Sequence, residues 1–305
     1  MTASEHSPGA AEIAPELPAN GIPFAKMSGS GNDFVMIDNR AGLLPDTTLP
    51  HFARRVCRRG VGIGADGVVT IEPLDPDQPE ADFRWRYLNA DGSDGALCGN
   101  GAMCGARFAV AAGIAPARCT FQTPSGLVEA DVDPDGPLVR ISIADSGPLA
   151  ATAMLDIPGS PLHFHAIRIG VPHAVAVVDD ADAFADHATF AACGRAVRYH
   201  PHFQPDGTNA NIIHRIAERT IRMRTYERGV EAETLACGTG AVASAIVATQ
   251  ELGMTGPVTV LTSSGRPLHV AFRWDAPTRC AREIQLTGEA RFIARGTLDP
   301  EGWAD

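Results

Sequence analysis

The chain contains two copies of one sequence unit, offset by 139 residues. The segment Cys98-Gly99-Asn100-Gly101-Ala102 aligns at this offset with Cys237-Gly238-Thr239-Gly240-Ala241. The same offset pairs Gly31 with Gly170, Tyr87 with Tyr226, Thr123 with Thr262, Ser125 with Ser264 and Gly126 with Gly265. This register holds without a gap from Gly31 to Gly126, and chance rarely produces such a match. The repeat therefore predicts two similar domains, each presenting one cysteine.

The length of 305 residues agrees with two domains, because single domains most often contain about 100 to 150 residues. We expect the first domain over residues 21–143 and the second over 144–288, with the junction inside Ser146–Pro161. A last strand, 289–298, is expected to return to the first domain. Residues 1–20 are rich in Ala, Pro and Glu and lack the pattern of a signal peptide, which predicts a disordered tail.

Short strands and one long apolar helix in each half predict the fold class. Alternating or apolar runs predict strands at 34–37, 68–71, 83–88, 174–178, 220–226 and 290–294, and two more after the second long helix. Helices are expected at 51–59, 102–112, 181–195 and 241–251, and a loop at 201–211. We therefore predict an α+β (α/β) protein with two pseudo-symmetric domains, each a curved, mostly antiparallel sheet wrapped around a central helix.

Composition excludes several classes of partner. The net charge is −11 and the basic residues are scattered, which argues against a nucleic acid or an anionic membrane surface. No apolar run approaches the ~18 residues of a membrane span. The seven cysteines are dispersed, which favours reduced thiols in a cytoplasmic protein over a disulfide framework. A small molecule is the expected partner; a homodimer is compatible with the sequence, which leaves the oligomeric state open.

A cysteine at a helix N-terminus is suited to proton transfer. The free N–H groups and the positive end of the helix dipole stabilise a thiolate and lower its pKa. Gly99 and Gly238 let backbone amides approach a substrate carboxylate closely, and those amides could also hold an enediolate. Asn100 and Thr239 are expected to cap the two helices. Two facing thiols could remove a proton from one side of a carbon and return one on the other, which is the chemistry of a racemase or epimerase.

Other interpretations of the cysteine motifs are weaker. The run from Gly238 to Ala243 fits a loose G-x-G-x-x-A dinucleotide signature, but no strand directly precedes it within a βαβ unit. The spacing of Cys98 and Cys104 is too wide for a zinc-binding C-x2–4-C pair. We therefore expect neither cofactor nor metal. The five remaining cysteines are assigned to core packing: Cys57, Cys104, Cys119, Cys193 and Cys280.

From about Pro23 to Thr297 the chain resembles diaminopimelate epimerase, a family of cofactor-independent enzymes that interconvert LL- and meso-diaminopimelate. The matching motifs are Gly29-Ser30-Gly31-Asn32-Asp33-Phe34, Asn89-Ala90-Asp91-Gly92-Ser93, Cys98-Gly99-Asn100-Gly101-Ala102, Tyr226-Glu227-Arg228-Gly229 and Glu233-Thr234-Leu235-Ala236-Cys237-Gly238-Thr239-Gly240. Each motif alone is weak, and together they are specific. The family fold, with two pseudo-symmetric domains, agrees with the repeat.

The resemblance implies roles for individual residues. Cys98 and Cys237 would be the acid/base pair. Four residues at the helix starts would hold the α-carboxylate at the reacting carbon: Gly99, Asn100, Gly238 and Thr239. Five others would bind the substrate, several of them at its distal end: Asn32, Asn89, Asn209, Glu227 and Arg228. The adjacent carboxylate and guanidinium of Glu227-Arg228 suit a second zwitterionic head, since each can pair with one of its charges.

The chain departs from the family at three places. Val171-Pro172-His173 replaces a common Asn-Pro-His, and Val171 is the repeat partner of Asn32. Ser28 stands where histidine is common, and the segment from Arg228 to Cys237 is one residue longer than in some members. These differences keep one alternative open, and the two facing thiols keep open a second. One is a racemase of another amino acid, and the other is a thiol-redox or binding protein in which Cys98 and Cys237 form a switchable disulfide.

Overall fold

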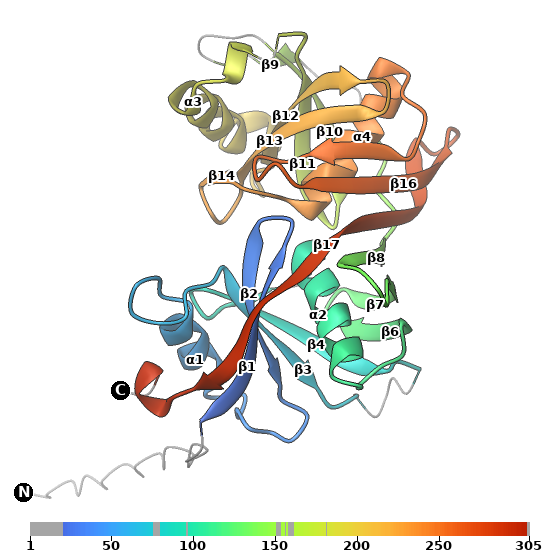
Figure 1. Ribbon diagram of the computed structural model, residues 1–305. Helices are drawn as coiled ribbons and strands as arrows, with labels where there is room; N and C mark the ends of the chain where they lie inside the picture. Colours follow the sequence, from blue (N-terminus) through green and yellow to red (C-terminus); the bar gives the residue numbers. More distant parts are fainter. Residues whose placement is uncertain are drawn as a thin grey trace, which may run out of the picture.

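The computed structural model describes residues 21–75, 80–95, 97–150, 154–155, 157, 162–180 and 182–303. The predicted tail, 1–20, lies outside these residues, as does much of the predicted junction Ser146–Pro161. The described chain forms two lobes joined by one long strand (Figure 1).

The first lobe places a long helix against a strongly bent sheet. Its elements are β1 (Ile22–Gly29), β2 (Asn32–Asp38), α1 (Leu49–Val56), β3 (Gly67–Glu72), β4 (Phe83–Asn89), β5 (Asp94–Gly95), α2 (Gly99–Ala111), β6 (Arg118–Thr123), β7 (Gly126–Val132) and β8 (Leu138–Ile143). Helix α2 contains small and apolar residues on nearly all sides, and most of them are buried. A helix that is apolar all round has to lie in the core, which is where α2 lies.

The second lobe repeats this arrangement. Its elements are β9 (Met154–Leu155), β10 (Leu162–Ile169), β11 (Val171–Val177), α3 (His187–Arg198), β12 (Asn209–Ala217), β13 (Thr220–Glu227), β14 (Ala232–Thr234), α4 (Gly238–Leu252), β15 (Val258–Leu261) and β16 (Pro267–Asp275). The buried central helix is α4, the counterpart of α2. Short 3-10 helices occupy Asp182–Phe184, Pro201–Phe203 and Pro300–Gly302.

Strand pairing confirms the predicted fold class. Each lobe has two parallel pairings at equivalent places: β2 with β3 and β4 with β6 in the first, β11 with β12 and β13 with β15 in the second. The other strand pairings found in the described residues are antiparallel. The repeat in sequence is thus a repeat in topology.

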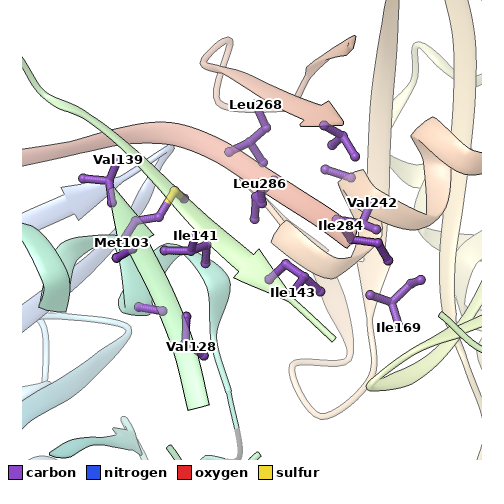
Figure 2. Close-up of a cluster of buried hydrophobic side chains, with 14 of the residues drawn as sticks. Met103, Val128, Val139, Ile141, Ile143, Ile169, Val242, Leu268, Ile284 and Leu286 are labelled. Carbon is purple, nitrogen blue, oxygen red and sulfur yellow. The ribbon is translucent and has the colours of Figure 1, made fainter. Parts of the chain in front are cut away.

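Strand β17 (Cys280–Leu298) belongs to both lobes. Its first part pairs with β16, its middle with β8, and its last part with β1, from Gly29 opposite Ala290 to Ile22 opposite Leu298. One continuous apolar core follows this crossing: Figure 2 shows Ile284 and Leu286 of β17 between side chains from both lobes. Because this core is shared, the lobes are fixed where α2 and α4 begin.

Several element boundaries differ from the sequence prediction. Helices α2 and α4 begin three residues earlier than expected, at Gly99 and Gly238, because the cysteines themselves take the N-cap position. Helix α3 begins at His187, where the Asp186 carboxylate accepts the Thr189 N–H at 2.8 Å. The predicted loop at 201–211 ends early, because β12 begins at Asn209 and pairs with β11. Strand β12 was not predicted.

Candidate active site

Each cysteine of the repeat is the N-cap of a buried central helix. Cys98 precedes α2 with φ −118° and ψ 113°, and Cys237 precedes α4 with φ −131° and ψ 110°. The Cys237 Sγ accepts the Gly240 N–H at 3.4 Å, which replaces the oxygen of an ordinary cap. The prediction that Asn100 and Thr239 cap the helices is therefore wrong. They occupy the second helical position, one residue past each glycine.

The two helix starts meet at the pseudo-twofold axis. A Cβ atom added at Gly238 would lie 3.6 Å from the Gly99 Cα, and one added at Gly99 would lie 3.8 Å from the Gly238 Cα. Either added atom would also lie 3.1 Å from the Leu286 Cδ2 on β17. Without side chains, the two glycines let the helix starts pack backbone against backbone, and an added Cβ would be tight only against Leu286. The motif glycines thus bring two positive helix ends, each with its thiol, to one place.

A buried chain of neutral hydrogen bonds supports the Cys237 side. Thr239 Oγ1 lies 3.6 Å from the Cys237 Sγ and 3.0 Å from the His173 Nε2. Behind the imidazole, the Asn211 Nδ2 lies 3.2 Å from the His173 Nδ1, and the Thr225 Oγ1 donates to the Asn211 Oδ1 at 2.9 Å. His173, Asn211 and Thr225 are each at most 1% exposed. Burial lowers the pKa of His173 to about 3, so the ring is neutral.

The Cys98 side uses a different, charged network. The Asn100 Nδ2 donates to the Asn32 Oδ1 at 2.7 Å, and the Asn32 Nδ2 donates to the Asp66 Oδ2 at 3.0 Å. Arg59 forms ion pairs with Asp66 at 2.9 Å and with Asp33 at 2.7 Å. The two halves therefore position equivalent residues, Asn100 and Thr239, by unlike means.

Glu227 lies at the end of β13, close to groups from both halves. Its carboxylate raises the pKa of the Cys98 thiol and of the Cys237 thiol, and Asp66 in turn raises the pKa of Glu227. Burial is the larger cause in each case. Through these effects Glu227 is linked electrostatically to Asp66 and to both thiols, as catalytic carboxylates often are to their neighbours.

The sequence predicts lowered pKa values for the two thiols, but in the structure both are raised. Burial raises the pKa of Cys98 to about 12, against a smaller lowering by the backbone N–H of Gly101. The pKa of Cys237 is also raised, again mainly by burial. The helix ends do act in the expected direction, but desolvation of a thiolate outweighs them. Desolvation therefore disfavours the thiolate at both positions, and a thiolate formed here would be a strong base.

The remaining predicted residues lie at strand ends: Asn209 at the start of β12, Arg228 just after β13, and Asn89 at the end of β4. Asn209 is buried at the start of β12, where its Oδ1 accepts the Arg228 N–H at 2.7 Å. The Arg228 Nη1 donates to the Asp206 carbonyl at 3.0 Å. Asn89 ends β4 and donates to the Ser93 Oγ at 3.0 Å within its own turn. Among the described residues, the sequence neighbour Ser93 accepts the Asn89 side-chain hydrogen bonds, so its own turn positions Asn89.

Sequence reasoning missed Asp66, Asn211 and Leu286 as parts of the site. It mentioned His173 only as the end of an unusual motif. The one available signal was that Val171-Pro172-His173 aligns by the repeat with Asn32-Asp33-Phe34, a motif already assigned to the site. Asn211 and Leu286 gave no signal, because their roles depend on which strands pass beside the helix starts.

The cysteines outside the repeat motif are in the core, as predicted. All seven cysteines are free, and Cys57, Cys104, Cys119, Cys193 and Cys280 are buried. Across the described ranges, no group of three or more His, Cys, Asp or Glu side chains is arranged to bind a metal. Nor is any helix of the described chain long and apolar enough to cross a membrane.

Comparison with known proteins identifies sequence relatives over almost the whole chain. The sequence model of one family, Diaminopimelate epimerase, matches residues 24–148 and 165–293. The diaminopimelate epimerase of Aquifex aeolicus is 41% identical over 288 residues, covering 92% of this chain and 99% of the relative. That of Archaeoglobus fulgidus is 40% identical, covering 91% and 96%.

More distant solved structures share the fold. A PhzF-family phenazine biosynthesis protein of Bacillus anthracis superposes with a TM-score of 0.70 at 14% identity, covering 91% of this chain and 98% of that one. A probable proline racemase of Agrobacterium radiobacter gives 0.68 at 18% identity, covering 92% and 94%. At these identities the likeness shows the fold alone, and it agrees with the two-lobed architecture predicted from the repeat.

Proposed function

The chain belongs to the diaminopimelate epimerase family, and from this premise we propose that it interconverts LL- and meso-diaminopimelate with Cys98 and Cys237 as the acid/base pair. The observation that carries the proposal is the meeting of two N-cap thiols at one pseudo-twofold axis, with Gly99 and Gly238 in contact range. A pair so related approaches a bound carbon from opposite faces. Inversion of configuration requires this geometry.

The reaction needs one thiolate and one thiol. The thiolate takes the α-proton, so an S–H bond forms as the C–H bond breaks and the electron pair moves into the carboxylate as an enediolate. The opposite thiol then gives its proton to the other face of the carbon and is left as the thiolate. No oxidant or cofactor is consumed. The two sulfurs exchange protonation states in each turnover, and the reverse reaction starts from the opposite state.

The two helix starts would hold the reacting carboxylate. The backbone N–H groups of the four residues after the cysteines have no partner earlier in their helices: Gly99, Asn100, Gly238 and Thr239. The positive ends of α2 and α4 point at the same place. Negative charge grows there on the carboxylate oxygens during proton loss. This stabilisation matters because the pKa of a carbon acid is far above that of a thiol.

The distal amino-acid head would be held by residues at the ends of β12 and β13. Glu227 suits an ammonium group, and the Arg228 guanidinium, steadied by the Asp206 carbonyl, suits a carboxylate. Asn209, Asn32 and Asn89 would complete the binding site. The substrate ammonium would also stabilise the charged form of Glu227, because a cation counteracts the effect of burial, which raises the pKa of this carboxyl.

A racemase acting on another amino acid remains the second candidate. Val171 favours it, because its side chain cannot form the hydrogen bond that its repeat partner Asn32 makes through its amide. A single-headed amino acid would need fewer polar contacts at the distal end. A thiol-redox protein is the third candidate, and it predicts a Cys98–Cys237 disulfide as the working form.

Four further properties belong to the same proposal. We infer a role in lysine biosynthesis from the proposed substrate, and a cytoplasmic location from the free cysteines. We also propose domains at 21–143 and 144–288, with 289–298 returning to the first, in agreement with the pairing of β17 and β1. A homodimer is the proposed assembly, to be tested by sedimentation.

Exchange in deuterated water tests the function. With LL-diaminopimelate and a reductant, we expect meso product carrying deuterium at one α-carbon. No exchange would overturn the proposal. Faster turnover of a single-headed amino acid would favour the second candidate, and activity only after oxidation would favour the third.

A further inference from the structure

The two halves of the site differ in the hydrogen bonds behind their thiols. Asn100 and Thr239 are equivalent by the repeat, but Asn100 is bonded to Asn32 in a charged network, whereas Thr239 ends a neutral chain that starts in the core. Only Thr239 has a hydroxyl, and it lies 3.6 Å from the Cys237 Sγ. The direction in which this hydroxyl points its proton therefore matters for one thiol only.

One contact fixes which way the Asn211 amide faces, and a second holds it there. Its Oδ1 lies 2.9 Å from the Thr225 Oγ1, and its Nδ2 lies 3.2 Å from the Ala174 carbonyl oxygen. A carbonyl oxygen can only accept, so the atom facing it has to be the amide nitrogen. The same nitrogen lies 3.2 Å from the His173 Nδ1. The Asn211 side chain is fully buried and packs directly against α4, where a Cβ added at Gly240 would lie 2.6 Å from its Oδ1.

These contacts leave the His173 imidazole with one tautomer. An Nδ1 that accepts from Asn211 carries no proton, and the ring is neutral because it is fully buried beside the positive charge of Arg228. The proton of neutral His173 therefore sits on Nε2, which donates to the Thr239 Oγ1. With that oxygen accepting from the ring, the hydroxyl proton is free to point to the Cys237 sulfur.

We propose that Asn211, held by Thr225, is a positioning residue that sets the tautomer of His173 and thereby makes the Thr239 hydroxyl a donor to the Cys237 sulfur. The assignment of Cys237 to proton transfer rests on the proposed function, but the direction of the hydrogen bonds does not. A donor to sulfur stabilises the thiolate over the thiol. The Cys98 side lacks a hydroxyl at the equivalent position. This chain of hydrogen bonds therefore favours the thiolate at Cys237 and not at Cys98.

Nitrogen-15 NMR of the histidine rings tests the direction of the chain in the full-length protein. We expect the native His173 to show a protonated Nε2 and an unprotonated Nδ1, with the signal assigned by its loss in His173→Gln. Asn211→Asp keeps the shape but replaces the donor with an acceptor, so Nδ1 of His173 should become protonated. A native His173 ring with its proton on Nδ1 would overturn the proposal, whether or not Asn211→Asp folded.

Thiol alkylation tests the consequence. In Asn211→Asp we expect iodoacetamide to modify Cys237 about tenfold more slowly, the size of one lost hydrogen bond to a charged group, with Cys98 changed less than about twofold. Thr225→Val, which removes the bond that orients the amide, should give a smaller change in the same sense. Equal slowing of both thiols, or none, would contradict the proposal.

The matched control is Thr259→Val. Thr259 also bonds to a histidine, with its Oγ1 3.1 Å from the His269 Nδ1, but on strands β15 and β16. It should shift the His269 resonance and leave His173 and both alkylation rates unchanged. A protein that shows the expected tautomer and does not exchange the α-proton of diaminopimelate would overturn the proposed function and leave this inference standing.

Discussion

Gly99 and Gly238 face each other so closely that a methyl group on Gly238 would lie 3.6 Å from the Gly99 Cα. These residues are 139 positions apart and occupy the same place in the two halves. Their approach brings both helix starts together. We therefore regard it as the structural basis of the proposed reaction.

Substitution at this contact should reduce catalysis more than stability. We expect Gly238→Ala to fold, because the nearest side-chain atom is the flexible end of Leu286 at 3.1 Å, and to lose about 1 kcal/mol of unfolding free energy. kcat should fall at least about tenfold, since misplacement of catalytic groups is costly. Gly256→Ala, with open space around it, is the control. Unchanged kcat in Gly238→Ala would contradict this view of the contact.

Leu286 should matter for both stability and activity. Its side chain is fully buried and touches the space between the two glycines. Leu286→Ala should lower the free energy of unfolding by about 2 to 5 kcal/mol, as buried leucines usually do, and should also reduce kcat. Leu286→Met, of similar volume, should retain most of both. Urea denaturation and initial rates measure the two effects. Loss of stability with full kcat in Leu286→Ala would show that Leu286 supports the core but not the site.

The charge of Glu227 should be visible at both thiols. Burial is the main cause of their raised pKa values, and the Glu227 carboxylate adds to it. Removing this negative charge makes a thiolate easier to form. In Glu227→Gln the pH dependence of iodoacetamide alkylation should therefore move to lower pH for Cys98 and for Cys237. A shift to higher pH, or at one thiol only, would show that the Glu227 charge does not act on both thiols.

His173 should make the fold sensitive to mild acid. Its pKa is about 3 in the fold, below its ordinary value of 6.5, so the unfolded chain takes up a proton that the folded chain refuses. The neutral ring therefore contributes fully above pH 6.5, and its contribution falls as the pH drops towards 3. Between pH 6.5 and about pH 4.5 the wild type should lose about 2 to 3 kcal/mol more than His173→Gln. Equal losses of unfolding free energy in the wild type and in His173→Gln, measured by urea titration, would contradict a buried neutral ring.

The sequence predicted most of the fold because the repeat is visible in it. Buried helices α2 and α4 and the strands before them follow from apolar runs and glycine stops. Strand β12 was missed because Asn209 and Asn211 are polar, and their reason for being buried is the site itself. The boundaries of α2 and α4 were wrong because a cysteine cap has no reliable pattern in sequence.

From the repeat alone, only the symmetric part of the site was predictable. Cys98 and Cys237, with their glycines, stand out because they occur twice. Asp66 and Asn211 do not repeat, and their partners lie on strands brought together by parallel pairing of β2 with β3 and of β11 with β12. The thiol pKa values were unpredictable for another reason: the sequence shows the helix start that lowers them but not the burial that outweighs it.

The most direct test of the two-thiol account is inversion by single-cysteine variants. Cys98→Ala and Cys237→Ala should each fold and each lose conversion of LL- to meso-diaminopimelate by a factor above about 1000 under reducing conditions, because one face of the carbon then lacks its acid or base. Cys104→Ala, which removes a buried thiol of α2, should retain conversion. If either Cys98→Ala or Cys237→Ala inverted the substrate at a rate near that of the wild type, the two-thiol account would be wrong.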